Sequence, residues 1–229
     1  MTSGKAIFIT GTGTQVGKSM ATSLLAQHLI TKGQSVITQK WVQSGGSATE
    51  DLETHWKWIN DSKNPYPDLM AWMAPYTFKT AAAPHLAAQL EEISIDESHL
   101  MATTYHLQTQ FDTVLIEGSG GLMVPISHTL TWLDILKTHR IPTIIVTENT
   151  LGCINHTLLT VQALQTADIP IIGIIYNHLP TTPNNPLIQE DNIAFIQQKT
   201  KLPTLAIIPA NATPDQVRWH FEGPYPKSD

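Results

Sequence analysis

The 229-residue sequence contains only one cysteine, Cys153. A single cysteine excludes an intrachain disulfide framework and suits a reducing compartment. The N-terminus leads almost at once into an apolar, β-branched segment, so we expect no signal peptide. Together these features predict a cytoplasmic protein.

Basic clusters and long apolar runs are also missing. The chain has 13 Lys and Arg against 19 Asp and Glu, a formal net charge of −6, and no cluster of basic residues. This balance disfavours nucleic acid and anionic membranes as partners. No apolar run approaches the length of about 20 residues that crosses a bilayer, and the ten histidines show no metal-ligand spacing. We therefore expect neither a nucleic-acid nor a membrane partner.

What the chain does have is an alternation of β-rich and helical patterns. A hydrophobic content of 41% can fill one sizeable core, so we expect one domain over residues 1–229. Most strand patterns are continuous apolar runs, typical of parallel strands buried on both faces. The alternation predicts an α/β fold, a doubly wound, mostly parallel sheet with helices on both faces. The expected strands are 6–10, 35–42, 113–117, 143–147, 171–176 and 205–209, and the expected helices are 20–32, 86–90, 98–108, 132–138, 154–166 and 192–199.

Two segments do not follow this alternation. Residues 45–83 read as an irregular insertion at the carboxyl edge of the sheet, and the tryptophans Trp56, Trp58 and Trp72 within it are expected to serve local packing. Residues 180–186 are rich in Pro and Asn and predict a solvated loop.

The segment 6–19, AIFITGTGTQVGKS, is the most informative part of the chain. A β-branched run feeds a Gly/Thr loop that opens into a helical pattern, the order found in phosphate-binding loops of P-loop NTPases. Backbone N–H groups at a helix N-terminus cradle anions, Lys18 can reach the outer phosphates, and the Ser19 hydroxyl can ligate Mg²⁺. Thr12 stands where the strict pattern has glycine, and a glycine-rich turn without a nucleotide is the alternative. The residues expected to bind ATP here are Gly13, Thr14, Gln15, Val16, Gly17, Lys18 and Ser19.

Polar residues also follow two other expected strands. Ligands of open α/β sheets bind outside the carboxyl ends of the strands, where Lys40 and Glu117 both lie. An acid that ends a buried strand is the usual partner of a nucleotide-bound Mg²⁺, whereas an unpaired structural glutamate there would be costly. Lys40 either extends to the surface or serves the site, and its position favours the site. Asp51 could be a second carboxylate on the metal or simply an acid at a helix start.

A second helix N-terminus follows the strand at 143–147. The segment 150–156 opens a long helix and suits a carboxylate or phosphate. Cys153 is not expected to be a nucleophile, because no histidine pairing is implied, and His156 is expected on the helix surface. Asn177 follows the next strand, where its amide could read the edge of a base.

Together these motifs resemble the dethiobiotin synthetases, the ATP-dependent enzymes of biotin synthesis. The resemblance spans nearly the whole chain, although the tail after Ala212 matches poorly. The matching segments are 11–19, Lys40 with Val42, Ser44 and Gly45, 75–78 with Pro84 and His85, EGSGGLMVP (117–125) and LGCINHTLLT (151–160).

The resemblance implies that 7,8-diaminononanoate and CO₂ react through a carbamate that attacks the γ-phosphate of ATP. Lys18 and Lys40 would be the catalytic residues, flanking the carbamate and the γ-phosphate. The enzymes of this family are homodimers, and the helix that begins at Leu151 would lend its N-terminus to the neighbouring subunit's substrate. By resemblance, Ser19, Asp51 and Glu117 would hold Mg²⁺, Asn177, Pro209, Ala210 and Asn211 would contact adenine, and Thr14, Lys40, Ser44, Gly120, Gly121, Gly152, Cys153 and Asn155 would contact the diamine substrate.

Three positions depart from the family pattern. Trp41 stands where proline is usual, Gln15 replaces a common acid, and Gly13 stands where Asp is frequent. Because Trp41 follows Lys40, we expect its indole to line the diamine site and a Trp41→Pro variant to keep its activity.

Two other readings of the phosphate loop compete with this one. A ParA/MinD-like switch ATPase would carry a signature lysine at the position of Gly13, which this chain lacks. An amidoligase of the cobyrinate-diamide type would need a glutaminase domain for which 229 residues leave no room. A divergent paralogue with an altered substrate is the remaining alternative.

Overall fold

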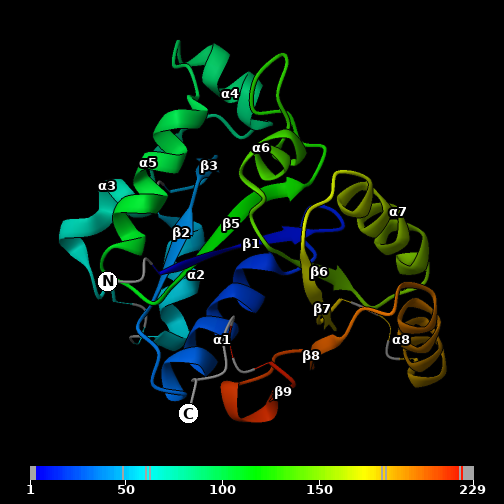
Figure 1. Ribbon diagram of the computed structural model, residues 1–229. Helices are drawn as coiled ribbons and strands as arrows, with labels where there is room; N and C mark the ends of the chain where they lie inside the picture. The colour runs from blue at the N-terminus through cyan, green and yellow to red at the C-terminus, as the bar shows by residue number, and fades with distance from the viewer. Residues whose placement is uncertain are drawn as a thin grey trace.

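Seven strands form one sheet in the computed structural model, in the order β2-β5-β1-β6-β7-β8-β9 (Figure 1). The structure describes residues 4–221 and 223, except for 48, 60, 62, 182 and 184. Neighbouring strands are parallel, apart from β9, which is antiparallel to β8. The strands are β1 (Lys5–Gly11), β2 (Val36–Lys40), β5 (Thr113–Gly121), β6 (Thr143–Glu148), β7 (Ile171–Asn177), β8 (Thr204–Ile208) and β9 (Arg218–Trp219).

Helices connect the parallel strands and cover both faces of the sheet, as the alternation of patterns predicts. They are α1 (Lys18–Thr31), α2 (Glu50–Ile59), α3 (Met70–Met73), α4 (Pro84–Leu90), α5 (Glu97–Gln108), α6 (Trp132–His139), α7 (Cys153–Thr166) and α8 (Pro186–Thr200), with 3₁₀ turns at Pro67–Leu69 and Pro214–Gln216. The doubly wound, mostly parallel fold is thus confirmed. In the part of the chain that the structure describes, no helix has the length and apolar character needed to span a membrane.

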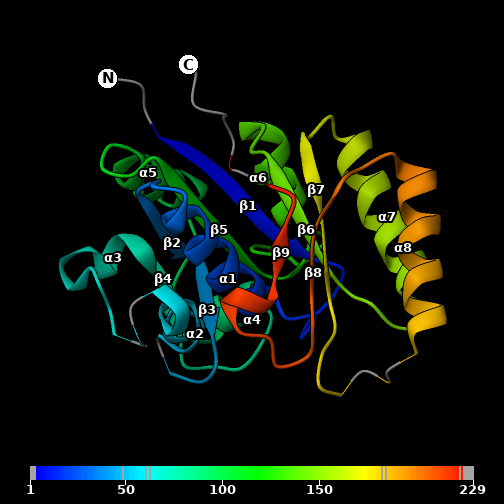
Figure 2. The same cartoon turned by 90° about the horizontal axis from the view of Figure 1, so that it is seen from below.

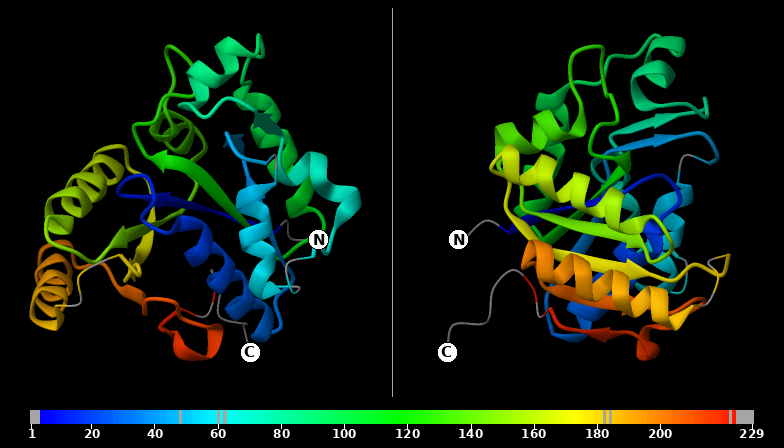
Figure 3. Two further views of the ribbon diagram at one scale, coloured as in Figure 1. Left: turned by 180° about the vertical axis from the view of Figure 1, so that it is seen from behind. Right: turned by 90° about the vertical axis from the view of Figure 1, so that its right-hand side faces the viewer.

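The two faces of the sheet bury two separate apolar clusters. Side chains of a strand alternate between its faces, so Ile7 and Ile9 of β1 pack with α1, whereas Phe8 packs with residues of α5, α6 and α7. Figure 2 shows α1 and α2 side by side, and Figure 3 shows α7 beside α8. This arrangement puts the N-terminus of α1 at the carboxyl end of the central strand β1.

One expected strand is in fact two. Residues 35–42 read as a single strand, but β2 ends at Lys40 and β3 (Val42–Ser44) pairs with β4 (Tyr76–Phe78) in a separate two-stranded sheet. A strand pattern in the sequence does not reveal a change of sheet, because residues of both β2 and β3 are buried.

The expectation for residues 45–83 is also wrong in part. The segment contains α2, α3, a 3₁₀ turn and β4 rather than irregular chain alone. Its tryptophans do serve packing: Trp56 is buried in the core, and Trp72 stacks on His106 with ring centroids 3.9 Å apart.

Near the C-terminus, α8 begins six residues earlier than expected. Asn185 caps the helix by accepting a hydrogen bond from the backbone N–H of Ile188 at 3.3 Å, and Pro186 occupies the first turn. The expected loop 180–186 therefore ends where the helix begins, and its residues 182 and 184 lie outside the described part of the chain. The strand β9 was not expected at all.

Trp41 does not line a binding site, contrary to the expectation. Its side chain is 0% exposed, and its ring packs against Phe8 and Trp132 with centroids 5.4 and 5.8 Å away. The indole N–H lies 3.1 Å from Oε1 of Gln39 and 3.0 Å from Oγ1 of Thr104. The side chain therefore belongs to the core beneath the point where the chain passes from one sheet to the other.

This burial reverses the expectation for a substitution at Trp41. Truncation of a buried tryptophan leaves a cavity and removes its ring contacts, so Trp41→Ala is expected to lower the free energy of unfolding by about 3–5 kcal/mol. Urea titration followed by far-UV circular dichroism measures this loss. Trp41→Phe, which keeps a ring but loses the N–H, should lower the free energy of unfolding clearly less. A Trp41→Ala variant as stable as the parent would contradict the core role.

Candidate functional site

The phosphate-loop segment joins the central strand to α1. Its backbone leaves β1 at Gly11 and enters α1 at Lys18, with Gly17 in the left-handed region at φ 86°. Gly17 is needed for a second reason: a Cβ atom there would lie 1.8 Å from Nδ2 of Asn177. The amide of Asn177 in turn donates a hydrogen bond to the Val16 carbonyl at 3.0 Å. The loop is therefore held against the carboxyl end of β7.

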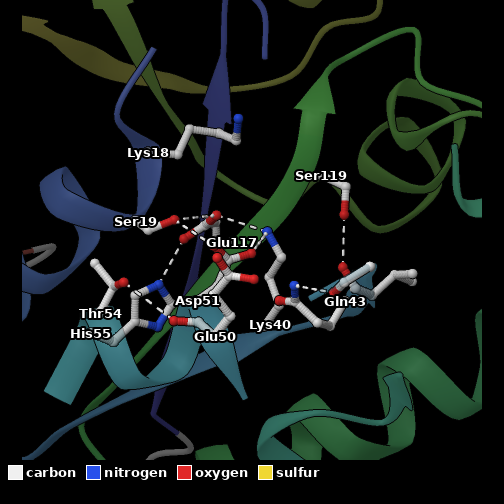
Figure 4. A network of polar contacts seen from close by, with 12 residues as sticks. Lys18, Ser19, Lys40, Gln43, Glu50, Asp51, Thr54, His55, Glu117 and Ser119 are labelled. Atoms are coloured by element: carbon white, nitrogen blue, oxygen red, sulfur yellow. Dashed lines mark hydrogen bonds and ion pairs between the residues drawn. The ribbon is translucent and has the colours of Figure 1, made fainter. Parts of the chain in front are cut away.

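Four polar side chains meet beside this loop (Figure 4). The Ser19 hydroxyl lies 2.9 Å from Oδ1 of Asp51 and 3.0 Å from Oε1 of Glu117. Nζ of Lys40 lies 2.7 Å from the same Glu117 oxygen and 2.8 Å from Oδ2 of Asp51. The structure thus brings together the three expected metal ligands and one of the two expected catalytic lysines.

Burial and charge act in opposite directions on this cluster. Burial alone would lower the pKa of Lys40, but the neighbouring Glu117 and Asp51 carboxylates outweigh it and raise that pKa. Burial would raise the pKa of Glu117, yet Lys40 and a hydrogen bond from His55 hold it well below its usual range. The pKa of Lys18 is lowered, chiefly by burial. Glu117 therefore remains a carboxylate in a site that excludes most solvent.

One residue that sequence reasoning missed is His55. Its side chain is fully buried on α2, and Nε2 lies 2.6 Å from Oε2 of Glu117. The signal that could have found it is its spacing from Asp51, because residues four apart share one face of a helix. That signal was hidden because no helix was expected at residues 50–59.

A cavity of about 330 Å³ opens over the cluster. Ten of the expected site residues line it, namely Thr14, Gln15, Gly17, Lys18, Ser19, Lys40, Ser44, Asp51, Glu117 and Gly120, and so do Met20, Gln43 and Ser119, which were not expected. Nζ of Lys18 lies 3.3 Å from the Gly13 carbonyl, so this lysine folds back over its own loop. Gly121 pairs with Gly11 of β1 and so also lies beside the loop.

The residues expected around adenine are not among those that line this cavity. Asn177 pairs with Ile208 across β7 and β8, and the turn of Pro209, Ala210 and Asn211 follows directly. All three turn residues are exposed, whereas Asn177 is buried. Asn177 therefore contacts the phosphate loop, and the turn 209–211 follows the neighbouring strand β8.

The N-terminus of α7 does not line the cavity of this chain. Gly152 is exposed, with φ 94°, and Asn155 is also exposed. The backbone N–H of Cys153 donates to the Thr150 carbonyl at 3.1 Å, so this donor is already satisfied within the chain. The Cys153 side chain points into the core, where burial raises the pKa of the thiol. A thiol in this setting does not act as a nucleophile.

The donor set fits a hard divalent cation. Hydroxyl and carboxylate oxygens are the ligands that Mg²⁺ prefers, and such sites are usually completed by water and by phosphate oxygens. Among the described residues, no group of three or more His, Cys, Asp or Glu side chains is placed to hold a metal without such help. Nζ of Lys40 lies between the two carboxylates, which shows that this position stabilises a cation. The arrangement can therefore bind a nucleotide triphosphate and neutralise charge on its outer phosphates.

Comparison with known proteins agrees with this geometry. The family model described as an AAA domain matches residues 5–218. The chain is 40% identical to the ATP-dependent dethiobiotin synthetase BioD 2 of Pasteurella multocida over 85% of its own length and 90% of the relative's. It is 42% identical to the enzyme of the same name from Haemophilus influenzae, over 77% and 93% of the two chains. The ATP-dependent dethiobiotin synthetase BioD of Lysinibacillus sphaericus is 39% identical over 88% and 86%.

Solved structures share the fold at low sequence identity. FlhF complexed with GMPPNP and Mg²⁺ superposes with a TM-score of 0.57 and 14% identity, over 96% of this chain and 71% of that one. MinD in the MinC:MinD complex of Aquifex aeolicus gives a TM-score of 0.54 and 14% identity, over 90% and 81%. At such identity these likenesses show the P-loop fold alone, and the likeness to MinD remains a distant one.

Proposed function

The chain belongs to the dethiobiotin synthetase family, and from that premise we propose that it uses ATP to convert 7,8-diaminononanoate and CO₂ into dethiobiotin, ADP and phosphate. The observation that carries this proposal is the convergence of Lys18, Lys40 and the Ser19–Asp51–Glu117 oxygens on one cavity at the carboxyl edge of the sheet. We propose that one domain carries the whole reaction, and the lone, buried cysteine supports a cytoplasmic location.

The reaction implied by the family has three steps. One substrate amine adds to CO₂ and loses a proton, which gives a carbamate. A carbamate oxygen then attacks the γ-phosphorus, the bond to ADP breaks, and a carbamic-phosphoric anhydride forms. The second amine attacks the carbonyl carbon, closes the ureido ring and expels phosphate. Such phosphoryl transfer needs mainly positioning and charge neutralisation from the protein.

The described residues can supply both needs. The loop N–H groups and Lys18 would hold the β- and γ-phosphates, and Lys40 would hold the carbamate against them. Ser19, Asp51 and Glu117 would hold Mg²⁺, which neutralises charge on the phosphate oxygens when bound. Asn177 and the turn 209–211 would contact adenine beside the loop.

The assay for this function is phosphate release with and without the two other substrates. We expect ATP turnover to require both the diamine and bicarbonate, because the carbamate formed from them is the nucleophile. With ATP and Mg²⁺ alone, release should fall to a small fraction of the full rate. Rapid release that the diamine does not change would instead favour a switch ATPase.

We further propose a homodimer in which the N-terminus of α7 serves the substrate site of the neighbouring copy. The two residues that precede α7 are open: Leu151 is 83% exposed, and a Cβ atom at Gly152 would meet nothing within 4 Å. Leu159 on the same helix is exposed as well, which suits an interface. Sedimentation velocity at assay concentrations tests this proposal, and a fully active monomer would refute it.

A further inference from the structure

His55 lies on the helix α2 and contacts the Glu117 carboxylate at the oxygen that does not contact Lys40. Its side chain is 0% exposed, and Nε2 lies 2.6 Å from Oε2 of Glu117 (Figure 4). A carboxylate oxygen can only accept a hydrogen bond, so Nε2 carries the hydrogen and donates it. The contact is therefore a charge-assisted hydrogen bond in a setting without solvent.

Because of this bond, the two Glu117 carboxylate oxygens have different hydrogen-bond partners. Oε2 accepts from His55, whereas Oε1 accepts from Lys40 at 2.7 Å and from Ser19 at 3.0 Å. With Oε2 held, the carboxylate cannot rotate about its last bond without losing a buried hydrogen bond. Oε1 therefore stays directed toward the Ser19 hydroxyl and the cavity.

The position of His55 is itself fixed by α1. The Ser23 hydroxyl, one turn after Ser19, donates to the backbone carbonyl of His55 at 2.7 Å. Ser19 likewise contacts Asp51, one turn before His55. Two residues four apart on α1 thus bind two residues four apart on α2, so the imidazole is set by the same helix that begins at the phosphate loop.

The second ring nitrogen has no comparable role. Nδ1 of His55 is buried and has no hydrogen-bond partner among the described residues. If Nδ1 carried a hydrogen, it would be a buried donor without an acceptor, which is costly. Only Nε2 is needed for the contact with Glu117.

From this geometry we propose that His55 is a positioning residue, which fixes the Glu117 carboxylate so that one oxygen faces the site where Ser19 and Asp51 would hold a metal. The inference rests on the proposed function, because it takes Glu117 as a metal ligand. Groups that orient metal ligands typically change metal affinity by about 10–100-fold when they are removed.

Two amide substitutions at His55 distinguish the roles of its two ring nitrogens. The amide nitrogen of glutamine lies about as far along the side chain as Nε2 of histidine, whereas that of asparagine lies about as far as Nδ1. His55→Gln can therefore keep the bond to Glu117, and His55→Asn cannot. His55→Leu is an apolar variant of similar size, which serves if His55→Asn does not fold. Thr143→Val removes a buried hydroxyl bonded to the Ile141 carbonyl at the amino end of β6, and so controls for a general loss of stability.

The measurement is nucleotide binding to the full chain by isothermal titration calorimetry. A non-hydrolysable ATP analogue is titrated with Mg²⁺ and, separately, in excess EDTA, and the ratio of the two Kd values gives the effect of the metal. We expect His55→Asn and His55→Leu to reduce that ratio about tenfold, with binding in EDTA unchanged. His55→Gln and Thr143→Val should keep the ratio of the parent protein.

The outcomes are distinct. If His55→Asn and His55→Leu lose stability in urea but keep the metal effect, His55 is a structural residue only and the inference is wrong. The inference is also wrong if the ratio of Kd values for His55→Gln falls as far as that for His55→Asn. If the parent protein shows no metal effect, the proposed metal site fails, and the role of His55 fails with it.

Discussion

Replacing Lys18 with alanine is expected to lower kcat for dethiobiotin formation about a thousandfold while leaving the fold intact. The lysine lines the cavity beside the phosphate loop, and its charge would act mainly on the γ-phosphate as it is transferred. Because burial lowers the pKa of Lys18, the folded state gains nothing from its charge, so the variant should unfold at the same temperature or higher.

Steady-state assays and thermal unfolding followed by circular dichroism measure the two effects. Lys137→Ala removes an exposed lysine from α6 and is the charge-matched control. It should change neither quantity. Near-normal dethiobiotin formation by Lys18→Ala would refute the assigned role, and a large loss of stability would show that the lysine also supports the fold.

Replacing Lys40 with methionine is expected to abolish most activity and, unlike the change at Lys18, to destabilise the protein. Lys40 is buried and lies within 2.8 Å of both Asp51 and Glu117. Without its charge the two carboxylates repel one another, and among the described residues Glu117 keeps only its hydrogen bonds from His55 and Ser19. Removing one partner of a buried ion pair typically costs about 3–5 kcal/mol. The carbamate would also lose its cationic partner, so the rate should fall more than nucleotide affinity.

Urea titration with and without Mg²⁺ tests the first effect, because a divalent cation can replace the missing charge. The double variant Lys40→Met with Glu117→Gln should recover part of the stability, since it removes one of the two like charges that repel one another. It should recover no activity. A Lys40→Met variant that is as stable as the parent in EDTA would show that the ion pairs contribute little.

These predictions rest on features of very different visibility in the sequence. The phosphate loop is local: a strand, a glycine turn and a helix start lie within fourteen residues, 6–19. Lys40 and Glu117 could be predicted because parallel strands bring their carboxyl ends to one edge. The fold class could be predicted because strand patterns alternate with helix patterns along the chain.

Other features depend on contacts between distant segments. Trp41 seemed to follow Lys40 into the site, yet the chain turns there into a second sheet and the indole meets Phe8 and Trp132 in the core. His55 became visible only once α2 was found packed on α1. The spacing of Asp51 and His55 could indicate a shared helix face, but the groups that His55 and Trp41 meet depend on which elements lie side by side.

The position of β1 at the centre of the sheet also bears on how the protein folds. Lys5 pairs with Thr113 of β5, and Phe8 pairs with Thr143 of β6, so both neighbours of β1 come from about half the chain away. Closing such large loops slows folding, because entropy is lost before the contacts form. During synthesis the phosphate loop therefore leaves the ribosome before the strands β5 and β6 that flank β1. A nascent chain acquires its nucleotide site only after β5 and β6 have emerged, and ATP can stabilise nothing before that point.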